Sequence, residues 1–584
     1  MKAKNIINSI KTKLMSIKPM GKLRLFLAWL LISALFIANS DTPFTSMLFF
    51  KEIKLGVFIP AVTVLWVILC KVGDDRFITV LLLISSLGYI LLGVSKHNDF
   101  SFAVGGSAVL CLIIYMTDLS SIKLRLRRNV KWMTAGLLIG GFTAFVGIIC
   151  CLYYFNHWTP CFDFGLFSQM FHHMKESGLP LITCERDHLL SHFAVHFSPV
   201  FYLLLPFFWL IPSPCTLLVM QALIVASGVI PLMLICKDHK LSEMSSCGFA
   251  VIYTLYPCFA GGCFYYLHEN NFLAPLILWL VYFCEKGRTA PKIVFLILLL
   301  SVKEDAAVYA AVISLYFLFT DKNYKCNLFM LIFSVIYFVT VTKLLALYGE
   351  GVMTGRYGNY DYDNSGSLLT VIWAAVKNPV YVVEQCFTQE KLIFSLQMLL
   401  PLGFLPFMTK RIGRYLLLLP FILVNLMSNY QYQHNINYQY CFGSGALLIY
   451  LSVINFADIK NPKLLLCSVY TSVTVFFGLY YNRLDYFKAY AEVTEQRTTI
   501  DRALSLIPED ASVISSTFFI PNLSQRDEIY ELERTDKKAE YYVLDLRYET
   551  EEYSAEDYLN SRYETVFYEE GAIGVFRDRE YIAE

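Results

Sequence analysis

The chain has 584 residues, of which 56% are hydrophobic and 16% charged, and its mean hydropathy is +0.51. This composition excludes a water-soluble multidomain protein, and we expect no nucleic-acid partner. The net charge of +1 hides a segregation: 24 acidic and 11 basic residues follow from Leu484 onward, and 37 basic and 23 acidic residues precede it, so we expect the basic part beside membrane and the acidic tail away from it.

A basic stretch from Lys2 to Arg24 opens the chain, and no convincing small-residue cleavage site follows it. This pattern predicts a retained first helix rather than a signal peptide. A membrane crossing needs about 20 apolar residues, or fewer where protein shelters the helix ends. The sequence then predicts about fifteen transmembrane helices, which begin near Leu25, Gly56, Phe77, Phe102, Trp132, Cys215, Cys247, Phe272, Lys292, Ala306, Cys326, Leu392, Tyr415, Phe442 and Leu464.

Lys and Arg collect between alternate predicted spans and mark the cytoplasmic side. The alternation holds if Phe193 to Ile211, which Pro199 and Pro206 interrupt, is a juxtamembrane or re-entrant helix. The N-terminus is then cytoplasmic and the tail extracytoplasmic. The loops that we expect on the outer side are 156–192, 268–271, 303–305, 349–391 and 428–440.

The first of these loops, 156–192, carries the densest group of ionisable residues. Asp163, between Phe162 and Phe164, is the first candidate for a catalytic carboxylate, because charges in aromatic surroundings at a membrane surface are costly unless they pair or bind something. The alternative is that Asp163 only caps the helix that follows. Cys161 and Cys184 of this loop would be able to form a disulfide in an oxidising compartment.

Three histidines continue from this loop at a spacing of four: His188, His192 and His196. On a helix they would form one stripe that could ligate a metal. A metal set would comprise Asp163, His188 and His192, with Mg²⁺ or Mn²⁺ as the ion. Direct contacts of the histidines to phosphate or water are the alternative that we favour.

The later outer loops add further ionisable and aromatic residues. Taken singly, each fits helix capping, a solvated face or tyrosine at the membrane interface. Together they bring carboxylates, His, Lys, Arg and Tyr to one side of the membrane, whereas a transporter would be expected to bury such groups within its spans. The predicted substrate- and phosphate-binding residues are Arg186, His188, His192, His196, His268, Lys303, Glu304, Asp305, Arg356, Tyr357, His434 and Tyr438.

The tail alternates a helical stretch, TTIDRALSLIP, with β-rich runs, the last of which predicts a hairpin that turns at Glu570-Gly571. Residues 484–584 are therefore predicted to form a small, soluble, acidic α/β domain. No glycine-rich phosphate loop opens its helix, so we do not expect a nucleotide site.

The motifs FDFGLFSQ, HFSP, HENNF, SVKEDAAVY and IPEDASVISSTFFIPNLSQRDEIY resemble, in this order, the bacterial membrane family called domain of unknown function 2079. The resemblance runs from about Trp132 to the C-terminus. The helices expected in residues 1–131 lie outside the resemblance and are an addition to the family's part of the chain. Residues 132–483 are then the transmembrane core, and the tail domain follows it.

That family looks like part of the GT-C glycosyltransferase superfamily. The resemblance implies an enzyme of the bacterial cytoplasmic membrane that transfers a sugar from a polyprenyl-phosphate carrier to an envelope acceptor on the outer face. It also implies acidic site residues in the first and next outer loops, at Asp163 and Glu269. GT-C enzymes often carry a pair of acidic residues at the first position, whereas Phe flanks Asp163, which weakens the case for metal. The alternatives are a flippase or transporter of a lipid-linked or polar solute, and a non-catalytic membrane scaffold.

Overall fold

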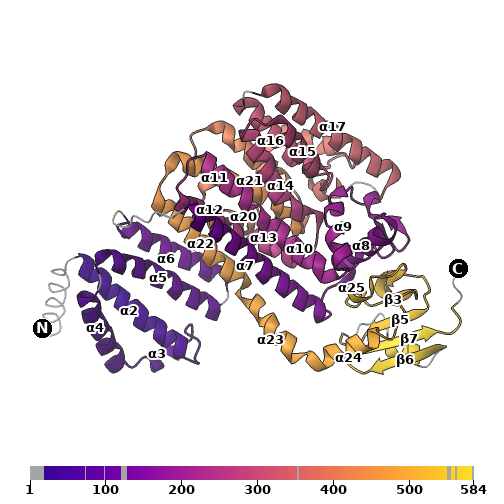
Figure 1. Cartoon of the computed structure of the whole chain (residues 1–584), viewed down its shortest axis with the longest axis horizontal. Coiled ribbons are helices and arrows are strands. Elements are labelled where there is room, and N and C mark those ends of the chain that lie inside the picture. The colour runs from indigo at the N-terminus through magenta and orange to yellow at the C-terminus, as the bar shows by residue number, and fades with distance from the viewer. Residues whose placement is uncertain are drawn as a thin grey trace.

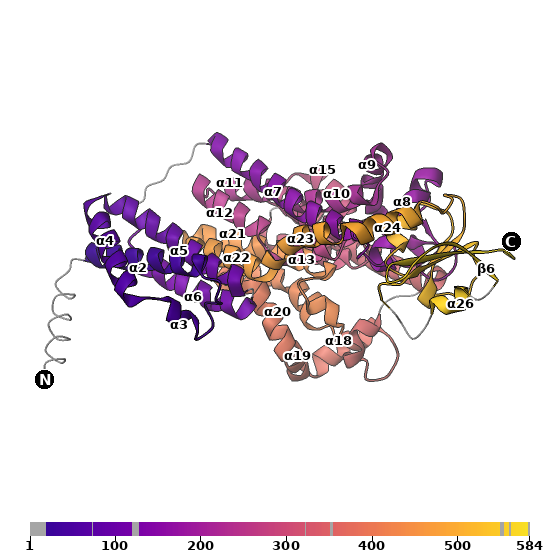
Figure 2. The ribbon, with the colours of Figure 1, turned by 90° about the horizontal axis from the view of Figure 1, so that it is seen from below.

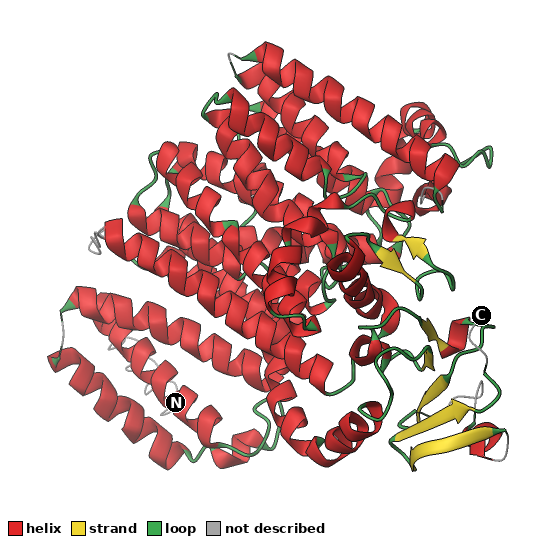
Figure 3. Cartoon of the chain, turned by 45° about the vertical axis from the view of Figure 1, so that its right-hand side comes forward, coloured by secondary structure: helices red, strands yellow, loops and turns green. Residues whose placement is uncertain are grey.

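The computed structural model describes residues 19–72, 74–97, 99–119, 128–321, 323–350, 354–548, 554–559 and 562–581. Lys2 to Lys18 of the predicted basic stretch lie outside these ranges. The chain is mostly helical, and Figure 1 shows it as a central helical body with a group of N-terminal helices at one end and a small sheet at the other. Figure 3 shows how little of the chain is strand.

Eight helices in the described ranges are long and apolar enough to cross a membrane. They are Met20–Asn39, Asp75–His97, Asn129–Phe155, Pro214–Asp238, Glu243–Phe264, Tyr324–Tyr348, Gln439–Ile459 and Pro462–Glu492. Six shorter apolar helices accompany them: Leu55–Lys71, Phe100–Met116, Thr289–Leu300, Ala306–Thr320, Leu368–Lys377 and Ile412–Leu426. The chain is therefore a membrane protein with several apolar helices.

The N-terminal helices form a group of their own: α2 (Pro19–Asn39), α4 (Leu55–Lys71), α5 (Asp75–His97) and α6 (Phe100–Met116). Within this group α2 packs on α4 and α5, while α5 and α6 contact α22 (Pro462–Tyr480) of the central body. Figure 2 shows the group at the end of the molecule away from the sheet. The N-terminal group therefore contacts the body chiefly along one helix.

The central body is built around α21 (Phe442–Ile459), whose residues 442–456 are all buried. A helix that is apolar on all sides belongs inside a bundle. The helices that complete the body are α7 (Arg128–Phe155), α10 (Pro214–Ser227), α11 (Val229–Asp238), α12 (Glu243–Thr254), α13 (Pro257–Phe264), α14 (Leu273–Glu285), α15 (Thr289–Leu300), α16 (Ala306–Thr320), α17 (Tyr324–Tyr348) and α20 (Gln389–Leu399). Loop 349–391 adds two short helices, α18 (Leu368–Lys377) and α19 (Pro379–Cys386), which project from the body in Figure 2.

Residues 161–211 fold as short elements rather than as one long helix. A turn at Cys161–Gly165 leads into α8 (Leu166–Ser177), after which β1 (Leu181–Ile182) pairs antiparallel with β2 (Leu190–Ser191). The predicted helical stripe of histidines is therefore wrong: His188 precedes β2, and His192 opens a short 3₁₀ turn at His192–Ala194. After that turn, the run that ends at Ile211 forms the 3₁₀ turn Pro199–Leu203 and the six-residue α9 (Leu205–Leu210).

The C-terminal part begins with α23 (Asp485–Glu492) and α24 (Thr494–Leu504), which lead to a five-stranded sheet in the order β4-β3-β5-β7-β6. The predicted hairpin is β6 (Tyr563–Glu569) with β7 (Ile573–Asp578), and its turn contains Gly571 at φ +72°. The other strands are β3 (Val513–Ser515), β4 (Ile529–Glu531) and β5 (Tyr541–Asp545), with α25 (Ile520–Leu523) and α26 (Ala555–Leu559) between them. The sequence patterns did not predict β4, because its three residues are too few to show an alternation.

Strand β4 lies at the edge of this sheet, and the 156–192 loop covers its outer side. The Thr183 hydroxyl accepts a hydrogen bond from the Ile529 N–H at 3.1 Å and donates one to the Ile529 carbonyl at 2.6 Å. The Gln169 amide donates to the Asp527 carbonyl at 3.1 Å and to Thr183 Oγ1 at 2.8 Å. Because Thr183 and Gln169 are both fully buried, these bonds satisfy backbone groups that an exposed edge would leave to water or to another chain.

Replacement of Thr183 by Val is expected to loosen this contact. The change keeps the shape of the side chain but leaves the N–H and carbonyl of Ile529 without their partner, at a cost of about 1–3 kcal/mol. Limited trypsin digestion should then cleave faster around α24, at Arg497 or Arg502. Thr498→Val, at an exposed threonine of α24, is the matched control and should leave the digestion pattern unchanged. Equal digestion of Thr183→Val and the unaltered protein would contradict the contact.

Candidate functional site

A cavity of about 270 Å³ lies where the 156–192 loop, the turns after α13 and α15, and the segments after α17 and before α21 meet. These segments are far apart in the sequence, and the helices between them hold their ends together. The predicted residues that line the cavity are Asp163, Arg186, His192, His196, His268, Glu269, Lys303, Arg356 and Tyr438.

Asp163 lies at the cavity wall in a short turn before α8. Its Oδ2 is 3.1 Å from Nε2 of His268, and the hydroxyl of Tyr265 also hydrogen-bonds to its carboxylate. Burial raises the pKa of Asp163. The His268 imidazole and the Tyr265 hydroxyl together lower it by more, so the pKa of Asp163 lies below its ordinary value. Gly165, not Asp163, occupies the position before α8, and no side chain caps that helix. The capping alternative for Asp163 is therefore wrong.

The turn that presents His268 is fixed by buried amides. The His268 N–H donates to Asn271 Oδ1 at 3.0 Å, and the Asn271 amide donates to Gln221 Oε1 at 2.9 Å. The Gln221 amide donates in turn to the carbonyl of Cys263 at 3.0 Å. Asn271 and Gln221 are fully buried, so α10 and the end of α13 hold this turn rigidly.

Glu269 and Lys303 form a buried ion pair beside this turn. Lys303 Nζ donates to Glu269 Oε1 at 2.7 Å, and the two side chains are 3% and 1% exposed. Burial raises the pKa of Glu269, but the charge of Lys303 and the nearby histidines together lower it by more, so the carboxyl stays ionised. Burial lowers the pKa of Lys303, but the charges of Glu269, Glu304 and Asp305 together outweigh this effect and raise it. Each ion of the pair therefore keeps the other charged.

Two histidines that line the cavity, His192 and His196, each contact a glutamate. His192 Nδ1 is 3.1 Å from Glu185 Oε2, and His196 Nδ1 is 3.0 Å from Glu304 Oε1. Burial and the charge of Lys303 lower the pKa of His196 despite the opposing effect of Glu304. At neutral pH His196 is then a neutral ring that can donate or accept one hydrogen bond.

Two arginines of the membrane part, Arg356 and Arg186, also line the cavity. The guanidinium carbon of Arg356 is 5.0 Å from the ring centres of both Tyr430 and Tyr440. Arg186 lies 3.7 Å from Glu350, a distance at which the contact is weak. Aromatic faces weaken the hydration of a guanidinium without neutralising it, so this part of the cavity suits an anion.

Other predicted residues do not line the cavity. His188 is exposed and lies 2.8 Å from the Arg186 carbonyl, and the hydroxyl of Tyr357 donates to the Leu423 carbonyl at 3.0 Å. His434 faces Glu390 at 3.8 Å, while Glu304 and Asp305 lie behind the wall. The suggested metal set of Asp163, His188 and His192 is not gathered, and no three His, Cys, Asp or Glu side chains within the described ranges form a metal-binding group.

Cys161 and Cys184 are buried neighbours whose thiols hydrogen-bond to each other. Both are free thiols in the structure, so the disulfide considered from the sequence is not formed. Cys184 Sγ also lies 3.5 Å from Gln169 Oε1, within the contact that covers β4.

Several residues that line the cavity were not predicted from the sequence: Glu185, Tyr265, Tyr430, Tyr432, Gln439, Tyr440 and Arg534. The tyrosines lie in two tyrosine-rich runs, YYLHENNF and NYQYQHNINYQY, that also contain the predicted residues His268 and Tyr438. Glu185 and Arg534 stand in charged runs in which nothing distinguishes them from their neighbours.

Asp305 should make stability depend on pH. Burial raises the pKa of its carboxyl to about 6, above about 3.9 in an unfolded chain, and its Oδ1 is buried without a hydrogen-bond partner. As the pH rises from about 3.9 to 6, Asp305 loses its proton more readily in the unfolded chain than in the folded one. This difference lowers the free energy of unfolding progressively, and the full loss is reached above pH 6. Asp305→Asn should therefore raise Tm more at pH 8 than at pH 4.5.

Thermal unfolding of the detergent-purified protein at the two pH values measures this difference. Asp536→Asn, at an exposed position, is the control and should shift Tm equally at both. An equal shift for Asp305→Asn would show that its carboxyl has no raised pKa.

A model of a known protein family matches residues 152–572, which is more than half of the chain. The family is described as predicted membrane protein (DUF2079). The match begins 20 residues later than the resemblance from Trp132 indicated, inside α7, and it includes the 156–192 loop and most of the C-terminal part. No curated protein matches the chain.

Proposed function

The chain belongs to the DUF2079 family of predicted membrane proteins, and from this starting point we propose that it is a GT-C-type glycosyltransferase. In this proposal it moves a sugar from a polyprenyl-phosphate donor to an envelope acceptor at the outer face of the bacterial cytoplasmic membrane. The observation that carries the proposal is the cavity that holds an ionised Asp163 together with Arg186 and Arg356.

The transfer needs a base and a site for the departing phosphate. Asp163 would accept the proton of the acceptor hydroxyl, whose oxygen then forms a bond to the anomeric carbon of the sugar. The bond from that carbon to the phosphate oxygen breaks, and its electron pair leaves with the polyprenyl phosphate. Arg186 and Arg356 would stabilise this phosphate, and the direct displacement inverts the anomeric centre.

The other predicted site residues take supporting roles. Lys303, predicted from the sequence to bind phosphate, is paired with Glu269. We therefore assign this ion pair the role of stabilising the cavity wall beside His268. His268 and Tyr265 position the Asp163 carboxylate. The residues present do not fit a protein-held Mg²⁺ or Mn²⁺ ion, because Asp163, His188 and His192 are not grouped, and we derive no step through a metal.

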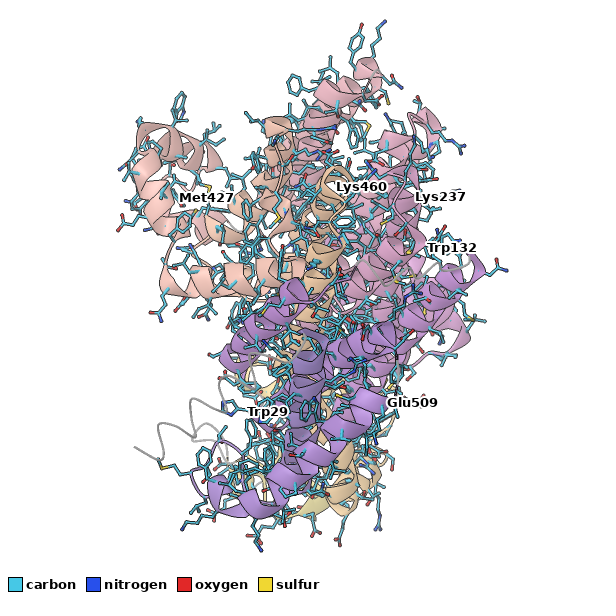
Figure 4. The ribbon with its side chains drawn as sticks, turned by 90° about the vertical axis from the view of Figure 1, so that its left-hand side faces the viewer. Trp29, Trp132, Lys237, Met427, Lys460 and Glu509 are labelled. Atoms are coloured by element: carbon cyan, nitrogen blue, oxygen red, sulfur yellow. The ribbon has the colours of Figure 1, made fainter. Side chains whose placement is uncertain are left out.

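The proposed topology has about fifteen crossings, the N-terminus in the cytoplasm and residues 484–584 outside as a soluble α/β domain. Helix α14 has Glu269 before its start and Lys286 after its end, and Lys286 lines a second cavity with Arg411 and Arg414. The basic end of the body thus lies away from the candidate site, as the positive-inside rule requires. Figure 4 likewise shows Lys237 and Lys460 away from Glu509 of the C-terminal part.

The shorter apolar helices would complete the crossings, because neighbouring helices shelter their ends. The exposed apolar residues of α18 and α19, among them Ile372, Trp373 and Val380, would lie in the outer interface of the membrane. A lipid-linked donor would then reach the cavity from the membrane side.

An assay on the purified full-length protein tests the proposal, with a panel of polyprenyl-phosphate sugars in detergent or nanodiscs. Transfer of the sugar to an added acceptor, or its slow hydrolysis, is the expected result. Failure to bind any lipid of the panel would overturn the proposal and favour a transporter or a scaffold.

A further inference from the structure

The C-terminal part contributes a side chain to the candidate site. Arg534 ends the 3₁₀ turn Leu532–Arg534, which directly follows the edge strand β4, and it lines the same cavity as Asp163. Its guanidinium carbon lies 4.3 Å from the ring centre of Phe162, the residue next to Asp163. A residue more than 350 positions later in the chain thus reaches the proposed catalytic loop.

The position of Arg534 is set by a buried contact and not by a chance approach of two surfaces. Five residues before it, both backbone groups of Ile529 bond to Thr183. On the other side of the loop the Arg547 guanidinium, which Asp545 holds at 2.6 Å, donates to the carbonyl of His157 at 2.7 Å. Figure 1 shows the sheet beside α8 and α25 at this end of the molecule. The loop that carries Asp163 is therefore held by the C-terminal part on two sides.

Charge in the cavity indicates what Arg534 binds. The carboxylates that line it each have a basic partner: Asp163 has His268, Glu269 has Lys303, and Glu185 has His192. Arg534 pairs through Nε with Glu531 at 2.9 Å, and that contact leaves the two terminal nitrogens of the guanidinium to act as donors. Arginine with two donors in a fixed plane suits the oxygens of a phosphate.

We propose that Arg534 binds the phosphate group of the lipid-linked donor, so that the membrane part and the C-terminal part share one site. This inference rests on the proposed function for the identity of the donor. Phosphate recognition is the chemistry that it commits to, and a free phosphate anion is the other source that the experiment must separate. Without the C-terminal part the cavity lacks one of its three arginines, Arg186, Arg356 and Arg534.

The test measures binding to the full-length protein in detergent, with a polyprenyl monophosphate, the corresponding polyprenol and inorganic phosphate as probes. Arg534→Ala should weaken binding of the polyprenyl monophosphate roughly tenfold or more, because a hydrogen-bonded charge is lost. Arg534→Lys should restore part of the affinity. Polyprenol should bind weakly and equally to all variants. Inorganic phosphate should compete only at much higher concentration, since it lacks the lipid.

Arg579→Ala is the matched control. Arg579 lies in the same part of the chain, is 66% exposed against 60% for Arg534, and also has one carboxylate partner, Glu564 at 3.6 Å. Its replacement should leave the Kd unchanged. The Tm of Arg534→Ala should fall, because the carboxylate of Glu531, whose side chain is only 6% exposed, loses its partner. Arg534→Lys keeps a charge beside Glu531 and separates the two roles. If Arg534→Lys had the Tm of the unaltered protein but recovered none of the affinity for the polyprenyl monophosphate, the proposal would be overturned.

The outcomes separate this inference from the proposed function. If Arg534→Ala binds the lipid phosphate as tightly as the unaltered protein, the inference fails, even where sugar transfer is observed. If binding falls in Arg534→Ala but the unaltered protein transfers no sugar, the phosphate site stands and the transferase proposal fails. If inorganic phosphate binds as tightly as the lipid, the site is one for free phosphate and the assignment to the donor is overturned.

Discussion

Replacement of Asp163 by Asn is expected to abolish sugar transfer while donor binding is retained. Asparagine keeps the size of the side chain but cannot accept the proton of the acceptor hydroxyl, and a general base typically contributes about 10²–10⁴-fold to a rate. The fall should appear in kcat, because Arg186 and Arg356 still bind the phosphate. Single-turnover transfer from a radiolabelled polyprenyl-phosphate sugar, measured at equal protein amounts, gives this value.

Asp187→Asn provides the comparison for this variant. Asp187 lies in the same loop but does not line the cavity, and its φ of +57° is one that asparagine adopts readily. Its replacement should leave kcat within about twofold, since asparagine keeps the size of the side chain and the residue lies outside the cavity. If Asp163→Asn kept the activity of Asp187→Asn, another group would have to serve as the base.

The second large effect is expected at the buried ion pair. Lys303→Ala leaves the Glu269 carboxylate buried without its partner, which typically costs about 3–5 kcal/mol of folding free energy. The variant should unfold at a much lower temperature or fail to accumulate in the membrane. Thermal unfolding of purified protein, followed by tryptophan fluorescence, measures the change.

A double replacement separates charge burial from the loss of packing. Lys303→Met with Glu269→Gln removes both charges and keeps most of the volume, so most of the lost Tm should return. Lys488→Ala, at a lysine that is 79% exposed beside Glu492, should have no measurable effect. A double variant as unstable as Lys303→Ala would show that the packing of the lysine chain, and not the unpaired charge, is what the structure needs.

The sequence predicted the membrane character, the family and the tail hairpin, because apolar length, ordered motifs and strand alternation are local signals. It also named residues from five separate loops that the structure brings to one cavity. It failed at the histidines: a spacing of four predicts a stripe only on a helix, and the pairing of β2 with β1 prevents that helix at His188.

Other features depend on tertiary contacts that no local pattern shows. The carboxylate of Asp163 looked equally able to cap a helix, and only the position of His268, set by Asn271 and Gln221, decides its partner. Lys303 and Glu269 are 34 residues apart, so neither motif revealed that each neutralises the other. The predicted count of fifteen crossings includes helices such as Thr289–Leu300. These helices are too short to cross a bilayer by themselves and would need neighbouring protein to shelter their ends.

The bonds between Thr183 and Ile529 also impose an order on biosynthesis. A ribosome makes the loop with Asp163 long before it makes β4, so this loop must wait beside the membrane while the later helices are inserted. The site can close only after nearly the whole chain has been synthesised. A chain that stopped before Ile529 would contain almost all the helices and yet would lack Arg534 and the bonds to Thr183, so the site would be unfinished.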